Sequence, residues 1–240
     1  MHVGLKFLAL NSLTNLRTCV MKIVSVNVGL TREVDWKGEI VTTGIFKEPV
    51  NHRVPIRKLN LDGDQQADLT VHGGEDKAIY VYPSEQYEFW RRELPEMDLP
   101  WGMFGENFTV EGLFEELVNI GDRLRIGTAE VVVTQPRLPC YKLGVRFGRS
   151  DMVKRFLQSR RTGFYLRVLR EGDVAAGDAI EWISRDPVKI SVVDIVRLYA
   201  FDRQDWKTMR RATQVDALPA GWRTYFADQL AKLPASGPNG

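Results

Sequence analysis

The chain has 240 residues, of which 44% are hydrophobic and 27% are charged, and its formal net charge is +2. These values are typical of a soluble globular protein with one large domain, or with one large and one small domain. They exclude the strongly basic footprint of a nucleic-acid-binding protein, and no hydrophobic run is long enough to span a membrane. The two cysteines, Cys19 and Cys140, are too few for a disulfide framework, so we expect a cytoplasmic protein.

The first twenty residues differ from the rest of the chain. The hydrophobic run at residues 7–10 is too short for a signal peptide, and Asn11 and Ser12 interrupt it. After Met21 the letters K-I-V-S-V-N-V alternate as they do in a strand. We therefore expect residues 1–20 to form a disordered extension and the folded unit to begin at Met21.

Short strand patterns dominate residues 21–186. Glycine-containing turns such as Gly121-Asp122 and Gly177-Asp178 separate many of them. This arrangement favours a β-barrel or a sandwich over a parallel α/β sheet. The expected strands cover residues 22–28, 39–46, 53–56, 69–71, 78–82, 107–110, 123–126, 129–134, 164–169 and 179–183.

Two helical patterns interrupt these strands. The first follows Ser84, a residue suited to cap a helix, and the second follows Ser150 or Asp151. The hydrophobic positions of the two patterns are Tyr87, Trp90 and Leu94, then Met152, Val153, Phe156 and Leu157. Spacings of three and four residues indicate amphipathic helices.

The pattern becomes helical after Pro187. Ser191 is suited to cap the first of three short amphipathic helices. The hydrophobic positions of the three are Val192, Ile195, Val196 and Tyr199, then Trp206 and Met209, then Trp222, Tyr225, Phe226, Leu230 and Leu233. We therefore expect a small three-helix domain at residues 187–235.

A thiol lies in the stretch T-Q-P-R-L-P-C-Y-K-L-G that follows the strand pattern at residues 129–134. Pro136 and Pro139 cannot donate to a β-ladder, which predicts a rigid loop that presents Cys140. Arg137 and Lys142 flank the thiol, and nearby cations favour the thiolate, which attacks electrophiles and binds soft metals. The alternative is a buried structural cysteine.

A glycine pair lies in the segment V-H-G-G-E-D-K-A, with His72, Asp76 and Lys77 close by. One interpretation is a hairpin turn in which the glycines supply positive φ angles. The other is an anion-binding concavity of backbone N–H groups, to which Lys77 adds charge, with Asp76 able to relay protons. The spacing alone favours neither interpretation.

Two further segments carry polar residues next to glycine. In F-G-E-N-F-T-V, Asn107 and Thr109 share one face of a strand, which lies either towards a ligand or towards solvent. The run L-D-G-D-Q-Q-A-D lacks the spacing of a calcium-binding EF-hand, so we interpret it as a turn that contacts a cleft. The sequence contains no zinc-site spacing of Cys and His and no Walker A motif.

Together the segments Q-P-R-L-P-C-Y-K-L, V-H-G-G-E-D-K-A-I-Y, L-D-G-D-Q-Q-A-D and F-G-E-N-F-T-V-E-G-L resemble the stand-alone bacterial MOSC proteins of the YiiM-like group. MOSC denotes the C-terminal domain of molybdenum cofactor sulfurases. The resemblance extends from about Met21 to Leu233. It implies a closed, mostly antiparallel β-barrel at residues 21–186, followed by a three-helix extension.

The resemblance also implies a molybdopterin-type cofactor, with Cys140 as the protein ligand to molybdenum, and the reduction of N-hydroxylated compounds such as hydroxylated nucleobases. It places Asp76 near the metal, and we expect Asp76 to donate protons. The residues expected beside the cofactor are His72, Asn107 and Thr109. The mitochondrial relatives hold the cofactor phosphate with an N-terminal β domain that this sequence lacks, so the expected phosphate anchors are Arg57, Lys77, Arg137 and Lys142.

The activity expected from this resemblance needs an external electron-donor reductase, because the sequence has no flavin or iron–sulfur motif. We expect a small-molecule substrate and neither a nucleic-acid nor a membrane partner. One alternative is a cofactor carrier or sulfur-transfer module in which Cys140 bears a persulfide. Another is a metal-free structural or regulatory protein that binds a small molecule.

Overall fold

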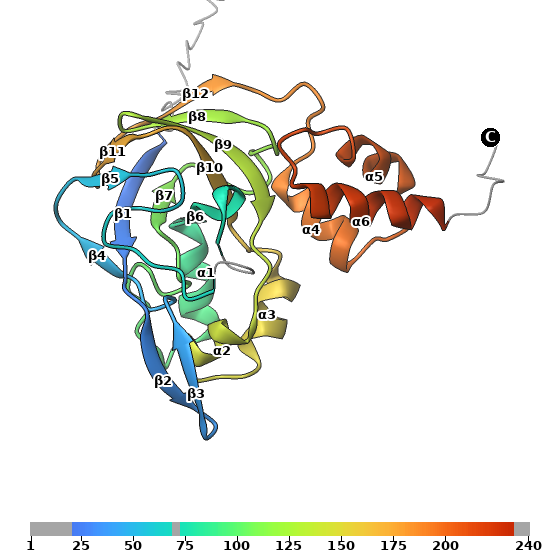
Figure 1. The fold of residues 1–240 in the computed structure, drawn as a ribbon. Helices are drawn as coiled ribbons and strands as arrows, with labels where there is room; N and C mark the ends of the chain where they lie inside the picture. The colour runs from blue at the N-terminus through green and yellow to red at the C-terminus, as the bar shows by residue number, and fades with distance from the viewer. Residues whose placement is uncertain (1–20, 69–72, 233–240) are drawn as a thin grey trace, which may run out of the picture.

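The computed structural model describes residues 21–68 and 73–232. Within these ranges the chain forms strands β1 to β12, helices α1 to α6 and one 3-10 helix, η1 (Figure 1). The strands are β1 Lys22–Val28, β2 Arg32–Trp36, β3 Glu39–Thr43, β4 Glu48–Val50, β5 Val54–Ile56, β6 Ile79–Pro83, β7 Phe108–Glu111, β8 Arg123–Ile126, β9 Ala129–Pro136, β10 Phe164–Arg170, β11 Gly172–Val174 and β12 Ile180–Ser184. The helices are η1 Glu75–Lys77, α1 Glu85–Glu93, α2 Tyr141–Phe147, α3 Met152–Ser159, α4 Val192–Ala200, α5 Trp206–Ala212 and α6 Ala220–Ala231.

Three sequence predictions lie outside the described residues. They are the extension at residues 1–20, the strand at residues 69–71 and the role of His72. No helix in the described part of the chain is both long and hydrophobic enough to cross a membrane.

One large sheet dominates the fold. Its strand order is β12-β8-β9-β10-β6-β7-β1-β4, and two smaller sheets pair β11 with β5 and β2 with β3. Only β6 and β7 pair in parallel among the described strand pairs, and the others are antiparallel. The expected mostly β fold with antiparallel pairing is therefore confirmed.

The large sheet is not closed by a ladder between its end strands, β12 and β4. Three backbone hydrogen bonds instead join the start of β1 to the chain at the start of β12. The amides of Ile23 and Ile180 donate to the carbonyls of Asp178 (2.9 Å) and Met21 (2.8 Å), and the Gly177 amide donates to Ile23 (2.8 Å). These bonds accompany an isolated bridge rather than a strand pair, so the closed barrel stays a prediction.

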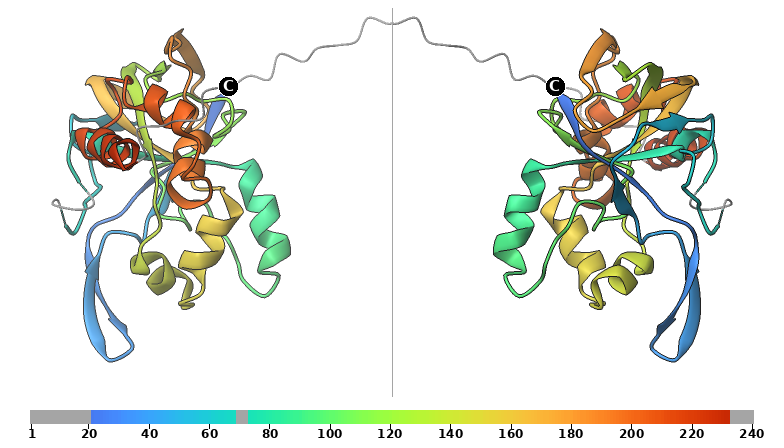
Figure 2. Two further views of the ribbon diagram at one scale, coloured as in Figure 1. Left: turned by 90° about the vertical axis from the view of Figure 1, so that its right-hand side faces the viewer. Right: turned by 90° about the vertical axis from the view of Figure 1, so that its left-hand side faces the viewer.

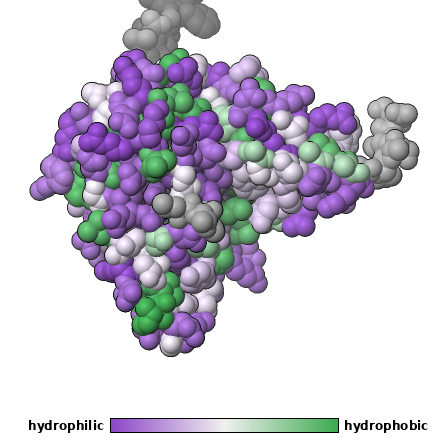
Figure 3. All heavy atoms as spheres, in the orientation of Figure 1, coloured by the Kyte–Doolittle hydropathy of each residue, from purple (hydrophilic) through white to green (hydrophobic). Residues whose placement is uncertain are grey.

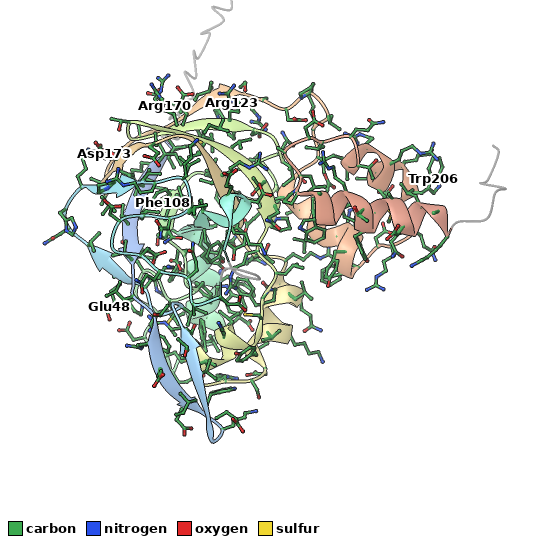
Figure 4. All side chains as sticks on the ribbon, viewed as in Figure 1. Glu48, Phe108, Arg123, Arg170, Asp173 and Trp206 are labelled. Atoms are coloured by element: carbon green, nitrogen blue, oxygen red, sulfur yellow. The ribbon has the colours of Figure 1, made fainter. Side chains whose placement is uncertain are left out.

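Side chains on the large sheet separate into a hydrophobic interior and a charged exterior, as strand alternation requires. In β8, Leu124 is buried while Arg123 is exposed, and Phe108 of β7 is also buried. Arg123 and Arg170 both pair with Glu130, at N–O distances of 3.6 and 3.0 Å, and lie at the top edge in Figure 4. The inner surface forms the main hydrophobic core.

A second, aromatic core lies where α1, α2 and α3 pack below the sheet in Figure 1. Tyr82 of β6 stacks on Phe104 with 4.5 Å between ring centroids, and Trp90 of α1 donates its indole N–H to the Tyr82 hydroxyl (2.7 Å). Helices α1 and α3 confirm the two predicted helices, but their N-cap residues, Ser84 and Asp151, make no side-chain capping hydrogen bond. Helix α2 was not expected, because the two prolines suggested only a loop around Cys140.

Helices α4, α5 and α6 match the three predicted C-terminal helices. Ser191 caps α4 as expected: its hydroxyl accepts from the Asp194 amide (3.1 Å), and the Asp194 carboxylate accepts from the Ser191 amide (3.0 Å). Val192, Ile195 and Phe226 belong to the same hydrophobic cluster as the sheet interior. The helices therefore share a core with the sheet rather than forming a separate one.

Three short strands, β2, β4 and β11, were not predicted. The β2–β3 hairpin extends away from the rest of the molecule in both views of Figure 2. Ile40 of β3 is 65% exposed, and Figure 3 shows a hydrophobic patch on this hairpin. The residues of β2 alternate weakly because this strand is largely exposed on both faces, which removes the pattern that identifies a strand.

A buried carboxyl group links α1 to the chain before β10. Glu115 accepts hydrogen bonds from the Gly163 amide (2.9 Å) and from the Gln86 side chain (3.2 Å). Burial raises the pKa of Glu115 from 4.5 to about 7, because the interior disfavours the charged carboxylate. Both hydrogen bonds lower it, but by less than burial raises it.

The raised pKa of Glu115 predicts a pH dependence of stability. The neutral form is favoured in the folded state, so the free energy of unfolding should fall by roughly 3 kcal/mol as the pH rises from about 4.5 to about 7. Glu115→Gln cannot ionise, so its unfolding free energy should vary less across this window. Urea unfolding of both proteins between pH 5 and 8 measures the difference. A constant offset between the two pH curves would contradict the prediction.

Candidate functional site

Strand β9 carries the chain to Cys140. The strand continues through Pro136, two residues further than predicted, and pairs there with Phe164 of β10. The Arg137 amide donates to the Gly163 carbonyl on the β10 side (3.3 Å). Because successive backbone nitrogens of a strand point to opposite edges, the nitrogen of Pro136 faces the edge away from β10. Strand β8 pairs with β9 only as far as Val132, and the missing N–H of Pro136 therefore costs no ladder bond.

Cys140 is the N-cap residue of α2 and is partly buried. Its thiol lines two neighbouring cavities, and Lys77 and Tyr165 line both of them as well. The thiol is therefore neither a deeply buried structural cysteine nor an exposed surface group.

The first cavity has a volume of about 80 Å³. Four cationic side chains border it together with Cys140, and they come from three separate segments of the chain. They are Lys47, Lys77, Arg137 and Lys142. This concentration of positive charge around a thiol favours an anionic ligand.

Glycines shape the wall of the first cavity. Gly105 has a φ of +80°, and a Cβ atom there would lie 2.7 Å from Cγ1 of Ile45. A Cβ atom on Gly44 would lie 2.1 Å from the carbonyl oxygen of Gln65. Both glycines allow the backbone of neighbouring loops to approach closely, so a side chain at either position would displace the cavity wall.

Arg137 and Lys47 are the two buried cations of the four, each with 6% of its surface exposed. Lys47 pairs with Asp64, whereas among the described residues no carboxylate forms an ion pair with Arg137. Its guanidinium lies over the rings of Tyr80 (5.0 Å to the centroid) and Phe156 (5.3 Å). Burial acts to lower the pKa of Arg137, but Tyr80, Tyr165 and Cys140 raise it overall, so the group stays charged. Its Nη1 atom is buried and has no hydrogen-bond partner among the described residues. A buried charge of this kind is costly unless an anion binds to it.

Asn107 and Thr109 lie in a buried polar network rather than on a solvent-exposed face. The Asn107 amide group accepts from the Tyr80 amide (3.0 Å) and donates to the Asp64 carboxylate (2.9 Å). Thr109 donates to Glu106 (2.9 Å). Asn107 lines the first cavity, whereas Thr109 does not.

The acidic run at residues 61–68 contacts the cleft, as interpreted. Asp64 is buried and pairs with Lys47, and its carboxylate also accepts from the Gly29 amide (3.0 Å). Asp64, Gln65 and neighbouring residues line the first cavity. Among the described residues, no group of three or more His, Cys, Asp or Glu side chains could hold a metal ion.

Asp76 lines the second cavity, and its carboxylate pairs with Arg167 of β10 (2.6 Å to Nε). The backbone carbonyl of Asp76 accepts from the side chains of Thr134 (2.7 Å) and Gln135 (3.3 Å), which fixes η1 against β9. Burial lowers the pKa of Lys77, and the neighbouring Asp76 opposes that effect.

The second cavity is larger, at about 680 Å³, and lies between the sheet and the C-terminal helices. Its wall combines the glycine pair, η1, the end of β9 and the chain around Cys140 with α4 and α6. The residues contributed by the C-terminal region are Tyr199, Pro219, Gly221, Trp222 and Tyr225. The C-terminal helices therefore form part of the wall beside the thiol.

The structure thus brings together five of the nine predicted site residues at the first cavity, namely Cys140, Lys77, Asn107, Arg137 and Lys142, and places a sixth, Asp76, on the second. Arg57 borders neither: it is exposed and pairs with Asp62 (2.8 Å). Sequence reasoning missed Tyr80, Lys47 and Tyr165 as cavity residues. A buried strand position and a lysine in a loop carry no local signal for a cavity, so no pattern would have identified them.

Two protein families match the chain. The MOSC domain family matches residues 68–181, and the YiiM-like 3-alpha helix domain family matches residues 190–233. The second match begins three residues after the predicted boundary at residue 187. The uncharacterised protein YflK of Bacillus subtilis is 42% identical over 211 residues, which cover 88% of this chain and 95% of YflK.

Similar proteins also include a solved structure and a named reductase. The crystal structure of YiiM from Geobacillus stearothermophilus has a TM-score of 0.73 at 36% identity, covering 88% of this chain and 99% of that one. A protein named reductase from Gibberella moniliformis is 32% identical over 196 residues, which cover 80% of this chain but 35% of that protein. The chain belongs to the YiiM-like group of MOSC-domain proteins.

Proposed function

We propose that the protein is a molybdenum-cofactor-dependent reductase of N-hydroxylated compounds, with Cys140 as the ligand to molybdenum. One observation carries the proposal: Cys140 lines the same small cavity as Arg137, whose buried Nη1 atom has no hydrogen-bond partner among the described residues. A soft thiolate suits the metal, and a buried guanidinium suits the phosphate of the cofactor. Membership of the MOSC family supports the choice of cofactor.

The residues at the first cavity fit an anionic group attached to a larger cofactor. A volume of about 80 Å³ is equivalent to a few water molecules and accommodates one phosphate-sized anion. Arg137, Lys77 and Lys142 would hold the phosphate, and Asn107 would contribute a polar contact at the cavity wall. Thr109 would not contact the cofactor. It would support the cavity wall through its hydrogen bond to Glu106.

The bound cofactor would supply the two electrons that convert an N–OH group and two protons into N–H and water. Asp76 is the proposed proton donor, because its carboxyl group lines the second cavity next to Lys77. Arg167 donates hydrogen bonds to this carboxyl group and fixes its position at the cavity wall. The 680 Å³ cavity gives water and substrate a route to Cys140.

The proposed reaction consumes electrons that the described residues do not store, so an external reductase has to deliver them. The relative from Gibberella moniliformis is named a reductase, which supports oxidoreductase chemistry for this chain. Because this chain spans about a third of that protein, the activity of the whole protein does not carry over directly.

Metal and pterin analysis together with turnover tests the proposal. The protein, purified from a host that makes molybdenum cofactor, should contain molybdenum and a pterin that fluoresces after oxidation. With a chemical reductant it should convert an N-hydroxylated adenine into adenine. Bound cofactor without turnover would instead favour the carrier or sulfur-transfer alternative. Absence of molybdenum and pterin from the active, folded protein would overturn the proposal.

A further inference from the structure

Three aromatic side chains of the C-terminal helices form one side of the second cavity. Tyr199 of α4 and Trp222 and Tyr225 of α6, here called the aromatic wall, are all partly exposed. The ring centroids of Tyr199 and Trp222 lie 5.4 Å apart and those of Tyr199 and Tyr225 lie 5.7 Å apart. The rings of Tyr199 and Tyr225 are inclined to that of Trp222 by 76° and 90°, so the three side chains line one cavity without forming a single flat surface. Aromatic side chains are typical of the lining of ligand-binding pockets.

Trp222 is held in place by the sheet. Its indole N–H donates to the side-chain oxygen of Gln135 (2.9 Å), the residue near the end of β9. The amide nitrogen of Gln135 donates in turn to the carbonyl of Asp76 in η1 (3.3 Å). Gln135 thus couples the aromatic wall to the turn that carries Lys77, and the single polar atom of the indole is satisfied. A ligand can therefore contact Trp222 only through the face or edge of its ring.

Stacking of Trp222 on Phe226 supports the wall from behind. The two rings are nearly parallel, with an interplanar angle of 29° and a centroid distance of 5.7 Å, and Phe226 is fully buried in the main core. A ring that is fixed by one hydrogen bond and one buried neighbour loses little conformational entropy when a ligand stacks on it. The cavity volume of about 680 Å³ lies in the range of ligand-binding pockets.

We infer that the second cavity binds the substrate, and that Trp222 of the aromatic wall stacks on a planar heteroaromatic ring so that the N-hydroxyl group of the ligand lies beside Cys140. This inference rests on the proposed function and adds to it a role for the three-helix domain. Trp222 is a specificity-determining residue, which favours planar aromatic N-hydroxylated compounds over small aliphatic ones. Apolar Leu138 and Pro139, which also line the cavity, suit such a ring.

Trp222→Ala and Trp206→Ala test this role. Trp206 is a matched control, because it is also a tryptophan of the three-helix domain but lies on α5 and borders neither cavity (Figure 4). Calorimetric titration of the cofactor-loaded proteins with adenine should show binding about tenfold weaker for Trp222→Ala, as expected for one lost stacking partner. Trp206→Ala should bind like the wild type, and Trp222→Phe should recover most of the affinity.

Steady-state kinetics with two substrates distinguish a change in substrate specificity from a general loss of activity. For Trp222→Ala, the ratio of kcat/KM for an N-hydroxylated adenine to kcat/KM for N-methylhydroxylamine should fall about tenfold, in line with the loss of stacking. An equal loss for both substrates, or unchanged adenine binding, would overturn the inference. Loss of pterin from Trp222→Ala would also overturn it, because the wall would then hold the cofactor. Adenine binding needs no turnover, so an inactive wild-type protein would refute the proposed function and leave this test intact.

Discussion

Cys140→Ala is expected to abolish the reduction of N-hydroxylated substrates while leaving the fold intact. Removing a residue that only supports a metal ligand typically lowers activity roughly 10–100-fold. Because Cys140 is proposed to bind molybdenum directly, its loss should lower turnover by more than that. The fold should survive, because the side chain is partly buried and makes no capping hydrogen bond to α2. Turnover per mole of bound molybdenum and the melting temperature measure the two effects.

Cys140→Ser distinguishes loss of a soft ligand from loss of side-chain volume. The hydroxyl stays protonated near neutral pH and is a hard ligand, so this variant should be as inactive as Cys140→Ala. Serine is a better N-cap residue than cysteine, so the serine variant should be at least as stable as the alanine variant. Cys19→Ser serves as the control at the other cysteine and should be fully active. Wild-type turnover and metal content in Cys140→Ala would show that Cys140 is not the ligand.

Arg137→Gln is expected to cause the second-largest loss of activity. It should do so by weakening the retention of the cofactor rather than by slowing the chemical step. A hydrogen bond to a charged group is worth about 1.5–3 kcal/mol, so removal of the buried guanidinium should weaken cofactor binding by roughly 10–100-fold. Arg137→Lys should retain part of the affinity, because it keeps the charge but loses the planar pair of donors. Molybdenum and pterin content per chain after dialysis measure the retention.

Arg57→Gln is the matched control for Arg137. Both arginines were predicted phosphate anchors, but Arg57 pairs with Asp62 at the surface and borders neither cavity. Exposed ion pairs contribute little to stability, so Arg57→Gln should keep both its cofactor and its melting temperature. Equal cofactor loss in the two variants, or unchanged cofactor content in Arg137→Gln, would contradict the role assigned to Arg137.

Much of the secondary structure could be predicted from the sequence because the signals are local. The alternation from Lys22 onward predicted β1, and the stripes after Ser84 and Ser191 predicted α1 and α4. The failures also have local causes. Helix α2 is short and follows two prolines, which made a loop the better prediction for Tyr141 and its neighbours. Two prolines also suggested that β9 ended early, although Pro136 faces an edge that needs no donor.

The sequence by itself determined that a thiol lies between Arg137 and Lys142, and that three amphipathic helices follow the strands. Only the tertiary structure decided which cations reach that thiol. Lys47, Lys77 and Arg137 lie on segments far apart in the chain, and sheet pairing and loop packing bring them to one cavity. The same holds for the aromatic wall, where Trp222 looks like any core residue of an amphipathic helix. Its position beside Cys140 follows from the core that the helices share with the sheet, and a long-range contact of this kind leaves no pattern in a single sequence.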